Sequence, residues 1–65
     1  MFILCVNIEG VRHHFNSEYG LTNEHPATEF KTIEKARSKA FELMTPELFN
    51  FFIVDSFTGE SLQRV

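Results

Sequence analysis

The sequence predicts a small α+β domain in which one amphipathic helix packs on one face of a small antiparallel sheet. Two observations predict this class. Residues 32–44, in the middle of the chain, carry apolar residues at helical spacing, and strand-like apolar runs lie on both sides of them. The expected order is ββαββ, two hairpins joined through one helix. A length of 65 residues suits one domain, so residues 1–65 are expected to fold as a single unit.

The first hairpin is expected from residues 2–8 and 11–15, with Glu9 and Gly10 at the turn. Successive side chains of a strand point to opposite faces, so one face of the first strand is wholly apolar and should meet the core. That face carries Phe2, Leu4, Val6 and Ile8. The opposite face carries Ile3, Cys5 and Asn7.

Residues 16–28 are expected to form a loop. Gly20, Asn23 and Pro26 interrupt this segment, and neither a helical nor a strand period runs through it. Long loops in compact domains are often functional. We expect Tyr19 to hold part of the loop against the body of the domain.

The helix is expected to begin after Thr32, a good N-cap, with Glu34 in its first turn. It should end near Met44, because Pro46 cannot continue it. Residues 45–48 have the pattern of a short extra turn that starts at the proline. The side chains expected to be buried by the helix are Ile33, Ala36, Ala40 and Leu43.

The second hairpin is expected from a strand at residues 51–54, a turn at 56–60 and an edge strand at 61–65. The chain has one cysteine, so an internal disulfide is excluded. A domain this small buries only about 60% of the surface that its unfolded chain exposes. Dimerisation, or docking on a larger partner, is the remaining way to bury more apolar surface.

Composition limits the compartment and the partners. No segment is long and apolar enough to span a bilayer, and residues 1–6 lack the charged start and cleavage site of a signal peptide. We therefore expect a cytoplasmic protein, in the host cytoplasm if the protein is viral, with no membrane partner. The net charge of −3 argues against non-specific nucleic-acid binding but does not exclude it.

The sequence predicts no catalytic, cofactor or metal site. His13 and His14 are neighbours in a strand and should point to opposite faces, so they cannot easily share one ion. Cys5 lies within an apolar strand, where a cysteine usually acts as a small hydrophobe. Because no nucleophile–base pair is visible either, we do not expect an enzyme.

Two surfaces are candidates for partner binding. Lys31, Lys35 and Lys39 recur every four residues along the helix, and could contact an acidic partner or form only a solvated face. One helix covers one side of a sheet, so Ile3 and Cys5 should lie in an apolar patch on the open side unless the loop folds over it. The full set of expected contact residues, with two from the loop, is Ile3, Cys5, Tyr19, Glu24, Lys31, Lys35 and Lys39.

Residues 30–36 and 52–60 carry a resemblance. The first reads Phe-x-Thr-x-Glu-x-Ala at the start of a helix, and the second reads Phe-Ile-Val-Asp-x-x-Thr-Gly-Glu in a hairpin. In these stretches the chain resembles short accessory proteins of bacteriophages and mobile elements. The resemblance implies an inhibitor of a host protein or of a defence complex, as anti-CRISPR proteins are. It assigns no functional residue.

The expected function is a small protein-binding module that inhibits or modulates a larger protein or nucleoprotein complex by occupying its surface, without catalysis. The alternative is a nucleic-acid-binding regulator that uses the basic residues of the helix. Steep salt dependence of binding would favour this alternative, because phosphate contacts release counterions.

Overall fold

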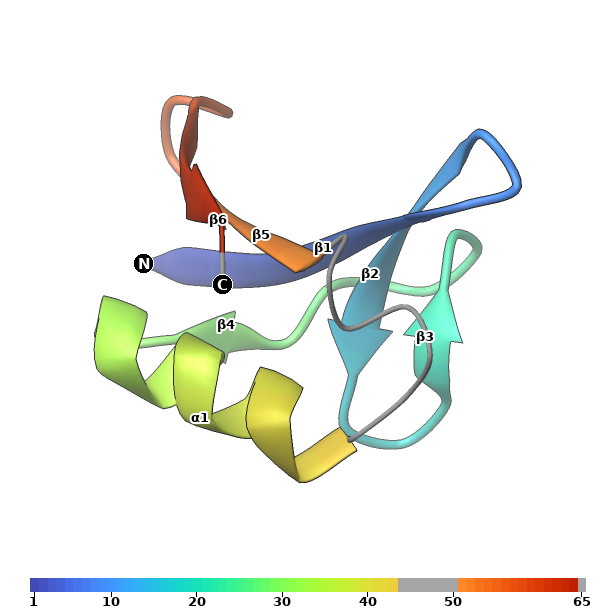
Figure 1. Cartoon of the computed structure of the whole chain (residues 1–65), viewed down its shortest axis with the longest axis horizontal. Helices are drawn as coiled ribbons and strands as arrows, with labels where there is room; N and C mark the ends of the chain where they lie inside the picture. The colour runs from blue at the N-terminus through green and yellow to red at the C-terminus, as the bar shows by residue number, and fades with distance from the viewer. Residues whose placement is uncertain (44–50, 65) are drawn as a thin grey trace.

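The computed structural model describes residues 1–43 and 51–64 of the chain. Figure 1 shows a sheet with one helix packed on one of its faces. In chain order the elements are β1 (Phe2–Ile8), β2 (Val11–Asn16), β3 (Gly20–Thr22), β4 (Glu29–Phe30), α1 (Ile33–Leu43), β5 (Phe51–Asp55) and β6 (Ser61–Arg64).

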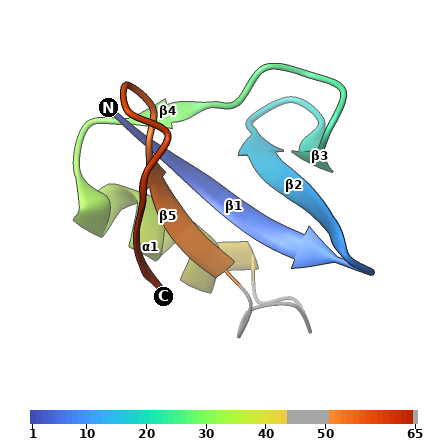
Figure 2. The same ribbon diagram turned by 90° about the horizontal axis from the view of Figure 1, so that it is seen from above.

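The sheet is antiparallel, with the strand order β3-β2-β1-β5-β6, and β4 also pairs with β1. The central strand, β1, pairs along one edge with β5. Its other edge is shared, because β4 pairs with Phe2 and Ile3 and β2 pairs from Cys5 onward. In Figure 2 β1 runs between β2 and β5, with α1 behind them. This central position explains why β1 contributes so much of the core.

The core lies between the sheet and the helix, as the alternation in β1 predicted. Leu4 and Val6 have no exposed surface, and Phe2 and Ile8 pack against the same cluster. The other fully or nearly buried members are Phe15, Ala36, Ala40, Phe51 and Ile53. The prediction of which face of β1 meets the helix is therefore confirmed.

The helix begins at Ile33, directly after the predicted cap. The Lys35 backbone N–H donates to Thr32 Oγ1 at 3.1 Å, which satisfies one of the free amides of the first turn. Ala36 and Ala40 are both 0% exposed, so their small side chains allow α1 to lie close against the sheet. Met44 and the expected turn at residues 45–48 lie outside the described residues.

The expected ββαββ order is wrong. The segment expected to be one loop contains β3, and β4 follows it before the helix. β4 is held by β1, which is distant in the sequence, whereas β3 pairs with the preceding strand β2 across the short turn at residues 17–19. Strands of 3 and 2 residues are too short to show an alternating pattern, so local sequence could not reveal them.

Both predicted hairpins are present. Glu9 and Gly10 have φ angles of 53° and 80°, as a two-residue turn of the type I′ class requires. In the second hairpin β5 pairs with β6, and a register shift follows Ile53. Val65, the expected last residue of the edge strand, lies outside the described residues.

Candidate functional site

The sheet face opposite the helix is more covered than the sequence predicted. Cys5 is only 3% exposed, and Ile3 and Phe52 are half-buried. The Arg12 guanidinium lies 5.1 Å from the centroid of the Phe52 ring and donates to Cys5 Sγ at 3.7 Å. Arg12 therefore covers part of the apolar patch that was expected to be open. Burial raises the pKa of the Cys5 thiol, and the neighbouring Arg12 offsets part of the rise.

The chain between β3 and β4 also folds over this face. His14 is paired with Cys5, so both side chains point away from the helix, and His14 Nε2 donates to the carbonyl of His25. Asn16 Nδ2 donates to the carbonyl of Pro26 at 2.7 Å. Tyr19 stacks on the His25 ring, with centroids 3.8 Å apart. The loop is thus held to β2 through His14 and Asn16, whereas the Tyr19 ring packs in this contact on another residue of the loop and not, as expected, on the body of the domain.

Lys31, Lys35 and Lys39 do not form a uniformly exposed basic surface along the helix. Lys35 is exposed, but Lys39 Nζ lies 3.2 Å from Glu42 Oε1 and 5.6 Å from the centroid of the Phe15 ring. The ion pair neutralises the charge of Lys39, since residues three apart are neighbours on a helix surface. Lys31 precedes the helix and lies at a pocket described below.

The seven expected contact residues lie on three parts of the molecule. Ile3 and Cys5 are on the sheet face opposite the helix, Tyr19 and Glu24 follow β2 and β3, and the three lysines belong to the helix and its entry. Glu24 is exposed, whereas Cys5 offers a partner almost no surface. Whether the seven contact a partner stays a prediction.

The turn between β5 and β6 is held by several hydrogen bonds. The Asp55 carboxylate accepts from the backbone N–H groups of Phe57 (2.7 Å) and Thr58 (3.2 Å). The Gly59 N–H donates to the Asp55 carbonyl at 2.8 Å, and Gly59 has a φ of 78°, which glycine adopts without strain. Ser56 ties the turn to the rest of the domain, because its N–H donates to the Met1 carbonyl at 2.8 Å. The conformation of the turn is therefore held by hydrogen bonds.

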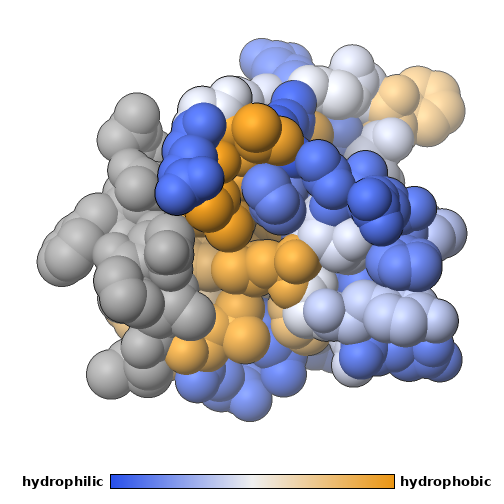
Figure 3. All heavy atoms as spheres, turned by 90° about the vertical axis from the view of Figure 1, so that its right-hand side faces the viewer, coloured by the Kyte–Doolittle hydropathy of each residue, from blue (hydrophilic) through white to orange (hydrophobic). Residues whose placement is uncertain are grey.

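Phe57 lies in this turn, and its side chain is 93% exposed. The other exposed large apolar side chains in the described residues are Met1, Val11, Tyr19, Phe41 and Leu62, all between 40% and 59% exposed. Figure 3, in which the right-hand side of Figure 1 faces the viewer, shows apolar atoms at the surface among hydrophilic ones. The turn at residues 56–60 could be predicted from the sequence, but the exposure of Phe57 was not predicted. The sequence feature that could have indicated it is a large apolar residue within a turn of small and polar residues.

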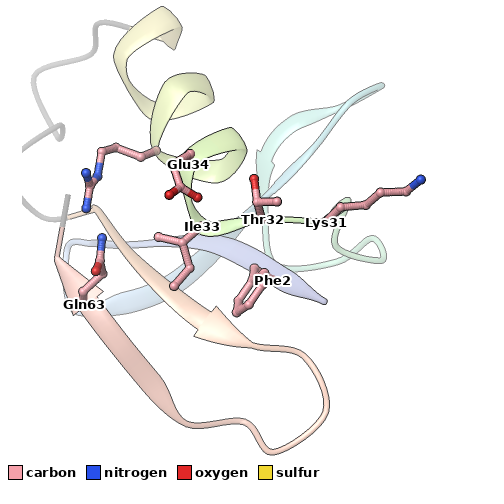
Figure 4. Close-up of a pocket in the computed structure, with 7 residues that line it drawn as sticks. Phe2, Lys31, Thr32, Ile33, Glu34 and Gln63 are labelled. Atoms are coloured by element: carbon pink, nitrogen blue, oxygen red, sulfur yellow. The ribbon is translucent and has the colours of Figure 1, made fainter.

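A pocket of about 380 Å³ opens between the start of α1 and β6. Figure 4 shows Phe2, Ile33 and Gln63 converging on it from β1, α1 and β6. The described residues that line it are Phe2, Lys31, Thr32, Ile33, Glu34, Arg37 and Gln63. Gln63 Nε2 is buried and has no hydrogen-bond partner among the described residues. The pocket could not be predicted from the sequence, because its walls come from three segments that only the fold brings together.

Within residues 1–43 and 51–64, no three histidine, cysteine or acidic side chains come together in a group that could hold a metal ion. In the same residues, no helix is of a length and hydropathy that would let it cross a membrane.

Because the described residues offer no such group, zinc is expected to leave the melting temperature of the protein unchanged. Binding of zinc to the folded state alone would raise this temperature. Thermal unfolding with and without zinc measures this. A saturable rise that disappears in a variant with both His13 and His14 replaced by alanine would show that these residues do bind the metal.

Acid should weaken the turn through Asp55. The N–H groups of Phe57 and Thr58 lower the pKa of Asp55 below its ordinary 3.8, because they stabilise the ionised carboxylate. Its contribution to stability is thus complete above pH 3.8 and is lost as the pH falls through the lower folded-state pKa. Thermal melts across this range should show a smaller loss of stability on acidification for Asp55→Asn than for the unmodified chain. Equal losses would contradict the role of Asp55.

No protein-family model matches the chain, and no curated protein or solved structure is significantly similar to it.

Proposed function

We propose that the chain is a small cytoplasmic protein-binding module that inhibits or modulates a larger protein or nucleoprotein complex. It would act by occupying a surface of that partner, without catalysis. The observation that carries the proposal is Phe57, which is 93% exposed on a turn fixed by the Asp55 carboxylate.

Burial of the Phe57 ring against a partner would gain binding free energy at a small entropic cost. Aromatic side chains are enriched at the centres of interfaces, where a few well-packed residues supply most of the binding energy. A turn already held by hydrogen bonds loses little conformational entropy on binding, so more of the burial energy appears as affinity. Phe57 contributes almost no buried surface within its own chain, so its apolar area is free for a partner.

The bacteriophage-type resemblance supports the inhibitory form of this function. It rests on residues 30–36 and 52–60, and the second stretch includes the turn that displays Phe57. The nucleic-acid alternative would use Lys31 and Lys35, since Lys39 is paired with Glu42. With a net charge of −3, the chain would have to bind phosphates against its overall repulsion.

Affinity capture from the lysate of the source cell, followed by binding measurements on the captured partner, tests the proposal. Phe57→Ala should weaken binding by roughly tenfold or more, as loss of an interface anchor does. Phe41→Ala is the matched control, because Phe41 is 51% exposed but lies on the helix surface, and it should bind like the unmodified chain.

Two charge substitutions separate the alternatives. Ile3→Lys reports on the sheet face opposite the helix, and Lys35→Glu reports on the helix surface. If Lys35→Glu weakens binding most and also reduces its salt dependence, the partner is a nucleic acid and the proposal fails. Full affinity of the Phe57→Ala variant would likewise remove the observation on which the proposal rests.

A further inference from the structure

We infer that the Phe57 turn of one copy docks into the α1–β6 pocket of a second copy, so that the chain forms a two-fold dimer. Within its own chain Phe57 contacts almost nothing, and the pocket is open. The dimer and the proposed function both use Phe57, but the partner in the dimer is a second copy of this chain.

The pocket and the ring match in size and polarity. Phe2 and Ile33 supply an apolar wall, and the volume is about 380 Å³. A dry apolar cavity of about 150 Å³ is enough to hold benzene. A phenyl ring therefore fits this pocket and leaves room for part of the turn that carries it.

The charges around the ring and the pocket are complementary. Phe57 is flanked by Asp55 and Glu60, and residues 55–63 contain no basic side chain. Among the described residues, Lys31 and Arg37 line the pocket with Glu34 as the one acid, and neither base is ion-paired. An acidic turn entering this pocket would gain favourable electrostatic contacts that steer it toward the site.

The pocket also offers a hydrogen-bond donor that the turn could satisfy. Gln63 Nε2 is buried without a partner in the described part of the chain, and a buried polar group of this kind costs free energy. The backbone carbonyls of Ser56 and Phe57 accept no hydrogen bond from the described residues. An incoming turn would bring such an acceptor.

Turn and pocket lie at the same end of the molecule. Phe2, which lines the pocket, is paired with Asp55, which holds the turn. A two-fold axis at this end would let each copy insert its turn into the pocket of the other. Such a reciprocal contact closes into a dimer and does not propagate into a filament. The dimer would cover Phe57, so self-association would compete with binding of the partner proposed above.

Sedimentation velocity over a range of concentrations, up to millimolar, measures the dimer. The unmodified chain should show a reversible monomer–dimer equilibrium. Phe57→Ala and Arg37→Glu should each weaken it by roughly tenfold or more. The matched controls Phe41→Ala and Lys35→Glu alter exposed positions of α1 that do not line the pocket, and they should dimerise like the unmodified chain.

A mixture of the two defective variants gives a sharper test. Phe57→Ala keeps an intact pocket and Arg37→Glu keeps an intact turn, so a mixed dimer retains one of the two contacts. It should form more readily than either variant associates with itself. A chain that stays monomeric at millimolar concentration, or a dimer that both variants leave unchanged, would overturn the inference.

The same variants distinguish failure of the inference from failure of the proposed function. Arg37→Glu should weaken dimerisation by roughly tenfold or more but leave binding of a captured partner intact or improved, because Phe57 is then more often uncovered. A monomeric chain that still binds a partner through Phe57 would refute only the dimer. A dimer with no Phe57-dependent partner would refute only the proposed function.

Discussion

Ala40→Asp is expected to unfold the domain. Ala40 is 0% exposed on the side of α1 that packs on the sheet, so the new carboxylate would be buried without a counter-charge. An unpaired buried charge costs several kcal/mol. A chain of 65 residues has a total stability of about 3–10 kcal/mol, so this one substitution is enough to remove most or all of it.

Far-UV circular dichroism and urea unfolding measure the effect. Ser38→Asp is the matched control, because it adds the same charge to an exposed position of the same helix and should change stability little. A well-folded Ala40→Asp protein with an ordinary unfolding transition would contradict the packing of α1 against the sheet.

Phe51→Ala is expected to cost about 3–5 kcal/mol in the free energy of unfolding. Phe51 is 0% exposed and belongs to the core cluster with Leu4 and Ile53. Removing its ring leaves a cavity that the neighbouring side chains can fill only in part. In a domain of this size the result is a protein that is largely unfolded at physiological temperature.

Phe57→Ala provides the control, because it is the same substitution six residues further along the chain. Since Phe57 is 93% exposed, the expected change in unfolding free energy is within about 0.5 kcal/mol. Urea unfolding of both variants gives the comparison. Equal destabilisation by the two substitutions would contradict the burial of Phe51. The small effect expected at Phe57 also makes it a clean position for the binding experiments.

Features set by neighbouring residues could be predicted from the sequence. Thr32 marked the start of the helix because a cap acts within one turn, and the Glu9-Gly10 turn marked the first hairpin. The alternation in β1 identified the face that carries Leu4 and Val6, since the two-residue period is a local property of any strand. The 3.6-residue period of a helix is equally local, so Ala36 and Ala40 could be assigned to the buried side of α1.

Features that depend on pairing between strands, and not on a period within one segment, could not be predicted. β3 and β4 exist because β2 and β1 offer them free edges, and their own few residues carry no period. The position of Arg12 over Phe52 depends on the registers in which β1 pairs with β2 and with β5. This is why a face that looked open in the sequence is partly covered.

Part of the candidate site could likewise be predicted from the sequence, and the rest depended on the fold. The sequence by itself determined the turn that carries Phe57, because Asp55, Thr58 and Gly59 act on one another within five residues. Only the tertiary structure decided that Phe57 is exposed while Phe51 is buried, since burial depends on which elements pack on either side of a strand. The pocket also required the fold, because Phe2 and Gln63 lie at opposite ends of the chain and meet only through pairing with β5.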